Sequence, residues 1–352
     1  MGGNDNQSST RKWYEWYSPD QSPEERRLVL KLDLLIVPYA FILYWVKYID
    51  QTNINNAYVS GMSEELNFNG NELVQFQTIF VVGNVLGLLP FIYLFPRVPM
   101  HYLVPTLDLG WGIFTLLQYR AQSYGEIMAY RFMVSIFEAS YFPERQGSVV
   151  KSVPFSWELL ARIFKNWKFY VLVLWDVFFF NTSANTAAFL LWIKSLHRYD
   201  IATMNNLSAI SPALGIFFVL FINFSADLWI SRAAAITLAS AFNFTGLVIL
   251  AVWNVPEPAK WLAFSVSYSA VAVSSVLYGW ANIILKDNIE ERALTLVLMT
   301  AIATSTNAWI PLFVYPTVES PRFPKGYVYS ACMVVCLVTM THIISYLFGS
   351  DG

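Results

Sequence analysis

The stretch "YRFMVSIFEASYFPERQGSVVKSVPFSW", residues 130–157, begins as an apolar helical segment and ends as charged, loop-like chain. Its apolar part contains Arg131 and Glu138. They are seven residues apart, so two helical turns place them on one face, about 10 Å from each other along the axis. The apolar run then stops abruptly at Pro143. The sequence therefore raises two questions: why opposite charges occur in an apolar helix, and why that helix ends where it does.

The composition of the whole chain is that of a membrane protein. Of its 352 residues 56% are hydrophobic and only 13% are charged, whereas soluble domains carry about 25% charged residues. Such a chain cannot cover its surface with water-facing side chains, so we expect a lipid bilayer to surround it. The net charge of −2 is uninformative, and the sequence has no basic block that would suggest a nucleic-acid partner. Residues 1–27 are polar and lack the apolar core of a signal peptide, so we expect a cytosolic N-terminus.

Ten apolar segments predict transmembrane helices, because a span of the bilayer needs about 20 mostly apolar residues. The segments are separated by stretches rich in proline and charge. The short alternating segments of a membrane barrel are absent from the sequence. The predicted fold is therefore all-α and polytopic. The ten predicted spans are 34–49, 73–95, 103–119, 126–143, 169–193, 205–226, 232–253, 260–284, 294–316 and 326–348.

The distribution of lysine and arginine predicts the orientation of these spans. With the N-terminus inside, the cytosolic segments contain 14 basic residues and the opposite loops contain 6, while Lys47 and Arg131 lie within spans. Cytosolic loops of membrane proteins are enriched in basic residues. We therefore expect both termini to be cytosolic.

Charged groups within the spans are costly and are expected to face a partner or a wet cavity. For Arg131 and Glu138 two interpretations stay open. In one, they hold their helix against its neighbours; in the other, Arg131 attracts an anionic substrate and Glu138 exchanges a proton. Asp176 lies in mid-helix and is followed by a polar patch at Asn181, Ser183 and Asn185, which indicates a wet interior.

The sequence contains none of the common signatures of soluble enzymes. The patterns GxxxxGK[ST], HExxH and GxSxG are all absent, and only three histidines occur. We predict no catalytic residues, no metal site and no cofactor. In the second predicted span, Gly83 and Gly87 form a GxxxG pattern that favours close packing of two helices.

Several segments resemble one family of fungal proteins. "KLDLLIVPYAFILYWVKYIDQTNINNAYVSGM" (31–62), "RFMVSIFEASYFP" (131–143), "YGWANIILKDNIEERALTL" (278–296) and "NAWIPLFVYPTVESPRFPKGY" (307–327) occur in the family's order. They resemble major facilitator permeases of the anion:cation symporter branch, which includes the allantoate, pantothenate and biotin permeases. The resemblance covers nearly the whole chain, and "NNAYVSGM" with "GNEL" is most similar to the vitamin permeases.

The resemblance also explains the end of the apolar run at Pro143. The family has two six-helix halves around a central cavity, and residues 131–143 resemble its fourth helix. Soon afterwards, "FSWELLARIFKNWKFYVLVL" (155–174) already resembles the approach to its seventh helix. Helices five and six are therefore expected to be absent. The implied organisation is a cytosolic tail (1–33), a shortened four-span half (34–143), a cytosolic linker (144–168) and a six-helix half (169–352).

The resemblance implies proton-coupled uptake of a small organic anion, such as pantothenate or a related vitamin, across the plasma membrane by alternating access. The alternative is a truncated, transport-inactive isoform that binds substrate or a full-length permease; a homo-oligomer is a further interpretation. The expected partners are the anion, protons and the lipid bilayer. The residues assigned to the substrate or proton pathway are Asp50, Asn53, Arg131, Glu138, Asp176 and Asn282, and those assigned to the gating loop are Arg97 and His101.

Overall fold

The computed structural model describes residues 22–94, 97–139, 157–183 and 187–349, and within these ranges it forms helices joined by short connections. The helices are α1 (Pro23–Ala57), η1 (Tyr58–Met62), α2 (Ser63–Glu65), α3 (Glu72–Leu94), α4 (Met100–Gln118), α5 (Tyr124–Glu138), α7 (Trp157–Lys165), α8 (Trp167–Phe180), α9 (Ala188–Ser195), α10 (Ile201–Ser208), α11 (Ile210–Leu228), α12 (Arg232–Val252), α13 (Glu257–Ser267), α14 (Ala270–Ile284), α15 (Ile289–Val314), η2 (Thr317–Glu319) and α16 (Pro324–Phe348). The described residues contain no strand, and the predicted all-α fold is confirmed.

Each predicted span coincides with one helix or with two consecutive helices. Five helical stretches are long and apolar enough to cross a membrane, judged by length and composition over the described residues. They are Ile201–Leu228, Arg232–Val252, Glu257–Ile284, Glu290–Val314 and Pro324–Phe348, and Glu72–Leu88 is a shorter apolar helix. The predicted end of the fourth span at Pro143 lies outside the described residues.

The predicted span 169–193 differs from the structure, because its helix is interrupted. Helix α8 ends at Phe180, and α9 begins at Ala188. At the end of α8, Asn181 Nδ2 donates to the Val177 carbonyl (2.8 Å) and Thr182 Oγ1 donates to the Phe179 carbonyl (2.7 Å). Short polar side chains of this kind compete with the backbone for hydrogen bonds, which favours the end of a helix.

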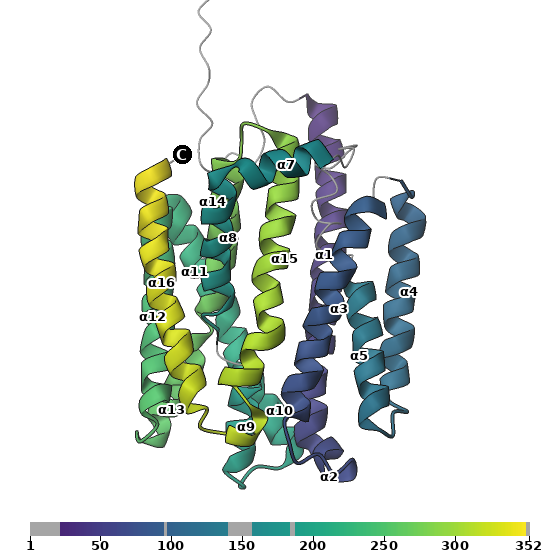
Figure 1. Cartoon of the computed structure of the whole chain (residues 1–352), viewed down its shortest axis with the longest axis vertical. Helices are drawn as coiled ribbons and strands as arrows, with labels where there is room; N and C mark the ends of the chain where they lie inside the picture. Colours follow the sequence, from purple (N-terminus) through teal and green to yellow (C-terminus); the bar gives the residue numbers. More distant parts are fainter. Residues whose placement is uncertain (1–21, 95–96, 140–156, 184–186, 350–352) are drawn as a thin grey trace, which may run out of the picture. The chain divides into compact units, whose positions relative to one another are not determined.

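The chain divides into two compact units, residues 1–53 and 54–352. The described part of the first unit, residues 22–53, consists almost entirely of α1, which contains Pro38 within the helix. In the second unit, α3 packs against both α5 and α15, and α5 also packs against α4 (Figure 1). Helix α8 packs against α15 and α16, α12 against α13 and α16, and α11 against α14.

Close helix packing between α3 and α5 depends on small residues, as the GxxxG pattern predicts. A Cβ atom on Gly83 would overlap with Ser135 Oγ and would lie 2.9 Å from the Phe132 carbonyl oxygen. At Gly87 a Cβ would lie 2.7 Å from the Cβ of Ala139. Glycine therefore allows the two backbones to approach closely, and any larger residue must push them apart.

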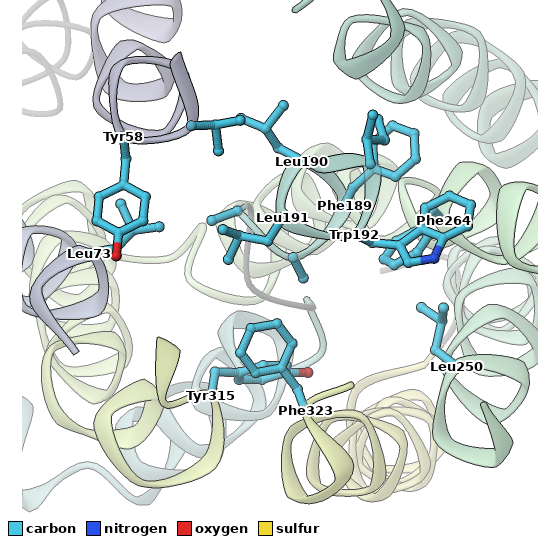
Figure 2. Packing of buried hydrophobic residues seen from close by; sticks show 14 of the residues in the cluster. Tyr58, Leu73, Phe189, Leu190, Leu191, Trp192, Leu250, Phe264, Tyr315 and Phe323 are labelled. Carbon is cyan, nitrogen blue, oxygen red and sulfur yellow. The ribbon is translucent and has the colours of Figure 1, made fainter. Parts of the chain in front are cut away.

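Two hydrophobic clusters hold most of the buried side chains. One joins residues near η1 and the start of α3 to α9, α13 and the region from Tyr315 to Tyr327; Phe189, Trp192, Phe264, Tyr315 and Phe323 are among its members (Figure 2). The other lies between α8, α12, α14 and α15 and contains Trp175 and Trp280. Many apolar side chains on the outside of the helices stay exposed, for example Leu116 (75%) and Phe313 (68%), as expected for surfaces that face lipid.

Helix α7 is amphipathic and contacts α8 and α15 (Figure 1). Its Leu159 and Ile163 are buried in a small cluster with Phe169 and Leu294, whereas Trp157 is exposed. Arg162 on its outer side pairs with Glu291 of α15 (3.4 Å). Helix α7 therefore connects the start of α8 to the start of α15.

Candidate functional site

Asp176 on α8 is the most completely buried carboxyl group of the described residues, with no exposed surface. Its Oδ2 accepts a hydrogen bond from the Tyr278 hydroxyl of α14 (3.1 Å). Its Oδ1 is buried and has no hydrogen-bond partner within the described part of the chain. None of the ion pairs formed by described residues includes Asp176. A carboxyl group held by one neutral hydroxyl in an apolar bundle is the type of group that marks a proton or ion pathway.

The hydroxyl next to Asp176 belongs to a short chain of hydrogen bonds across three helices. Thr300 of α15 donates through Oγ1 to the Tyr278 hydroxyl (3.1 Å) and also lies 2.9 Å from the Leu296 carbonyl oxygen. Asp176, Tyr278 and Thr300 therefore join α8, α14 and α15. Sequence reasoning identified Asp176 but missed its two partners. The signal was weak, because tyrosine and threonine are common in apolar helices and only the fold shows which of them reach the carboxyl group.

A second polar layer lies at the end of α8. Asn181 Nδ2 donates to Thr306 Oγ1 of α15 (2.8 Å), and Asn243 Nδ2 of α12 donates to the Thr182 carbonyl (3.0 Å). The hydroxyls of Ser330 and Tyr315 are 2.9 Å apart. The polar patch that the sequence predicted after Asp176 thus binds the interrupted helix to α12 and α15. Its member Ser183 is exposed, and Asn185 lies outside the described residues.

Arg131 and Glu138 are both buried on α5, with 2% and 4% of their surface exposed. The Arg131 guanidinium lies over the ring of Phe80 on α3, with Cζ 4.5 Å from the ring centroid. A cation over an aromatic face is stabilised by the ring quadrupole, and more so away from water. The structure thus places one cationic and one acidic residue inside the α3–α5 packing, where both predicted roles remain open.

The other predicted site residues are Asp50, Asn53, Asn282, Arg97 and His101. Asp50 is buried and Asn53 is exposed, and both belong to the first unit. The Asn282 side chain is exposed and donates to the Tyr278 carbonyl of its own helix (2.9 Å). Arg97 and His101 are exposed near the start of α4. The functions of these residues stay predictions.

Two ion pairs lie at helix ends: Lys194 is near the end of α9, and Glu257 is the first residue of α13. The sequence did not predict either pair. Lys194 Nζ of α9 lies 2.8 Å from Glu64 Oε1 of α2 and 3.3 Å from Ser63 Oγ. The hydrogen bond from Lys194, assisted by one from Ser63, lowers the pKa of Glu64 to about 2. Arg198 pairs with Glu257, whose pKa is lowered by hydrogen bonds from Trp261 and Arg198.

The described residues contain no group of three or more histidine, cysteine or acidic side chains that could hold a metal ion. Among the described residues, the buried Asp, Glu and Arg side chains of the second unit are Asp176 on α8 and Arg131 with Glu138 on α5, and Asp50 of the first unit is buried as well. This arrangement can take up charge or protons within an apolar bundle.

No family model matches the chain. It is 32% identical to the vitamin H transporter of Saccharomyces cerevisiae, over 96% of this chain and 76% of that protein. It is 24% identical to the pantothenate transporter liz1 of Schizosaccharomyces pombe, over 92% of this chain and 82% of that protein. It is 22% identical to the MFS transporter PfmaC of Pestalotiopsis fici, over 95% of this chain and 82% of that protein.

These alignments are longer than the chain itself. The alignment with the S. cerevisiae protein extends over 450 residues, whereas this chain has 352. At least 98 residues of that relative therefore have no counterpart here within the aligned stretch. The other two alignments, over 429 and 440 residues, show the same excess.

Proposed function

Because the chain belongs to the vitamin-permease branch of the fungal major facilitator superfamily, we propose that it takes up a small organic anion of the vitamin class, such as biotin or pantothenate. It is an integral, multi-pass membrane protein. The single observation that carries the proposal is the similarity to the vitamin H transporter over nearly the whole chain. The buried carboxyl of Asp176 supports it, since such groups within membranes typically belong to substrate or proton pathways.

Proton symport by alternating access is the mechanism we propose for this uptake. Transporters of this architecture bind their substrate near the middle of the membrane and expose it to each side in turn. Asp176 and Glu138 serve as the proton-linked carboxyls, and Arg131 attracts the anion. Asp50 and Asn53 act at the outer mouth.

Asn282 completes the proposed pathway in the C-terminal half, and Arg97 with His101 forms the gating loop. The protein resides in the plasma membrane with both termini in the cytosol. In this orientation the Glu64–Lys194 pair lies on the outer side.

The proposed organisation is a cytosolic tail (1–33), a shortened first half (34–143), a cytosolic linker (144–168) and a six-helix half (169–352). At least 98 residues of the vitamin H transporter have no counterpart here, which supports a loss of helices five and six before the linker. Five helical stretches that are long and apolar enough to cross a membrane follow the proposed linker among the described residues, and they support this organisation.

Uptake of labelled biotin and labelled pantothenate tests the proposal directly. We expect accumulation of one of them in fungal cells that lack their own carriers and produce this chain, and we expect a protonophore to abolish it. Asp176→Asn and Glu138→Gln should reduce the accumulation, whereas Asp287→Asn, at an exposed position, should not. Equal rates in the first two variants and the original chain would remove these carboxyls from the mechanism.

The second candidate function is a transport-inactive isoform that binds substrate or a full-length permease. The missing residues favour it, because a half with four spans lacks part of the wall around the cavity. Binding of labelled vitamin to the purified protein without accumulation in cells would support this function. Accumulation would exclude it.

A further inference from the structure

Three side chains from three helices form a continuous polar contact in the second unit. Asp176 has no exposed surface and Thr300 has 7%, and both contact the Tyr278 hydroxyl at 3.1 Å. The surroundings are apolar: Trp175, Leu277, Trp280 and Met299 are buried beside them in one cluster. A buried polar group of this kind is costly unless its hydrogen bonds are formed.

We propose that Tyr278 is a positioning residue that fixes the carboxyl group of Asp176, and that Thr300 fixes Tyr278 in turn. This inference rests on the proposed function, in which Asp176 carries a proton. It goes further in naming the two hydroxyls that control the exchange and the oxygen at which the exchange occurs.

The hydrogen-bond directions follow from the chemistry of the hydroxyl groups. An ionised carboxylate can only accept, so the single hydroxyl hydrogen of Tyr278 points to Asp176 Oδ2. The Tyr278 oxygen then accepts from Thr300, whose own hydrogen is shared between Tyr278 and the Leu296 carbonyl. Thr300 thereby favours the one orientation of Tyr278 that serves Asp176.

The free oxygen of Asp176 is the site of proton exchange. Oδ2 is occupied by Tyr278, whereas Oδ1 has no hydrogen-bond partner among the described residues. A hydronium ion that reaches the bundle transfers one proton to Oδ1: the new O–H bond forms there, and a neutral water molecule is left. In the reverse step, water takes the same proton and the carboxylate is restored.

Tyr278 is the titratable group that contacts Asp176 from the helices packed against α8, namely α7, α14, α15 and α16. None of the described ion pairs joins Asp176 to any other group on these helices. The other charged or titratable residues on them are Glu158, Arg162 and Lys165 on α7, Glu290, Glu291 and Arg292 in the first turns of α15, and Lys325, Tyr327, Tyr329, Cys332, Cys336, His342 and Tyr346 on α16.

Infrared difference spectroscopy of the purified protein in lipid vesicles, titrated over pH, tests this inference without any need for transport. The original chain should show a carboxylic-acid band that disappears in Asp176→Asn. Tyr278→Phe removes a donor to the carboxylate, so the proton should be held more firmly. The midpoint of the band's titration should then move upward by about one pH unit, and its frequency should change.

Variants at Thr300 separate positioning from mere packing. Thr300→Val keeps the volume but loses the hydroxyl, and it should move the midpoint in the same direction as Tyr278→Phe by a smaller amount. Thr300→Ser keeps the hydroxyl and should restore the original midpoint. All variants should elute as the original chain does in size-exclusion chromatography.

The proposal would be overturned by a midpoint in Tyr278→Phe equal to that of the original chain, or by equal effects of valine and serine at Thr300. Failure of the proposed function gives a different result: no vitamin uptake, with the Asp176 band and its shifts intact. If proton-coupled uptake is intact but the titration midpoint of the band does not change in Tyr278→Phe, only the positioning role of Tyr278 is rejected.

Discussion

Helices α5 and α8 both carry ionisable side chains within apolar bundles, but the neighbouring side chains that contact these groups differ. On α5, a guanidinium and a carboxyl lie two turns apart, and Arg131 is held over the Phe80 ring. On α8, Asp176 is held by the hydroxyl of Tyr278. The two buried charged residues of α5 have opposite signs, whereas protonation of Asp176 changes the charge beside Tyr278 by one unit. We therefore expect Arg131 on α5 to attract the anion, and we expect Asp176 on α8 to contribute to proton exchange together with Glu138.

Neutralising Asp176 should have the largest effect on transport. In Asp176→Asn the side chain can no longer take up a proton, so concentrative uptake should fall to the level of cells without the protein. Exchange of labelled for unlabelled vitamin, which needs no net proton movement, should continue. Both are measured in the same vesicles with and without an imposed pH gradient. Unchanged concentrative uptake would end the assignment of proton exchange to α8.

Changes at Arg131 should weaken substrate binding rather than its coupling to protons. A hydrogen-bonded pair between arginine and a carboxylate contributes about 1.5–3 kcal/mol, and each 1.4 kcal/mol corresponds to a factor of ten in affinity. Arg131→Met should therefore raise the Kd for the anion by about 10- to 100-fold. Arg131→Lys, which keeps the charge but loses the fork, should have a smaller effect.

The measurement is equilibrium binding of labelled vitamin to the purified protein. The exposed Arg162→Met, at an ion pair on α7, is the matched control and should bind as the original chain does. If Arg131→Met binds the labelled vitamin with normal affinity, only the structural interpretation of Arg131 is left, in which it holds α5 against α3.

Glycine substitutions should show how tightly each region is packed. Gly83→Ala would force α3 away from α5, and Gly246→Ala would force α12 away from α13, where the Ala263 carbonyl oxygen lies 2.6 Å from the added Cβ. Each should destabilise the protein by about 1–3 kcal/mol. Gly112 has no atom within 4 Å of the added Cβ, so Gly112→Ala should be neutral or stabilising by up to about 1 kcal/mol.

The Tm of each of the three glycine variants is measured by thermal unfolding in detergent, with intrinsic fluorescence as the signal. A shift in Tm for Gly246→Ala but none for Gly83→Ala would mean that α3 and α5 can separate at little cost. In that case the buried position of Arg131 would owe less to the α3–α5 contact than the structure indicates.

Much of the fold could be predicted from the sequence, because each apolar segment is long and stretches rich in proline and charge separate it clearly from the next. The GxxxG pattern also predicted the close contact at Gly83. The interruption of α8 was not predicted, because the polar patch that begins at Asn181 was interpreted as part of a wet helix and the break depends on local side-chain hydrogen bonds.

The candidate site could be predicted only in part. A buried charge in an apolar span is visible from composition, so Arg131, Glu138 and Asp176 were identified. The partners Tyr278 and Thr300 lie more than 100 residues from Asp176, and their contacts arise from the packing of three helices. Such long-range pairs leave no periodic signal in a single sequence.

The smallest effect is expected at the pair of Glu64 and Lys194, which lies at the surface away from both buried groups. The pKa of Glu64 is lowered from 4.5 to about 2, so its ionised form stabilises the fold above pH 4.5, and this contribution is lost as the pH falls toward 2. Because both side chains are partly exposed, the pair should contribute less than about 1 kcal/mol. Lys194→Met should therefore lower Tm slightly at pH 7, and the difference from the original chain should shrink as the pH is reduced from 5 to 3. The control Lys286→Met, at an exposed lysine, should show no such pH dependence. A Tm difference that is constant with pH would mean that Lys194 stabilises the protein through its apolar stem and not through the charge of Glu64.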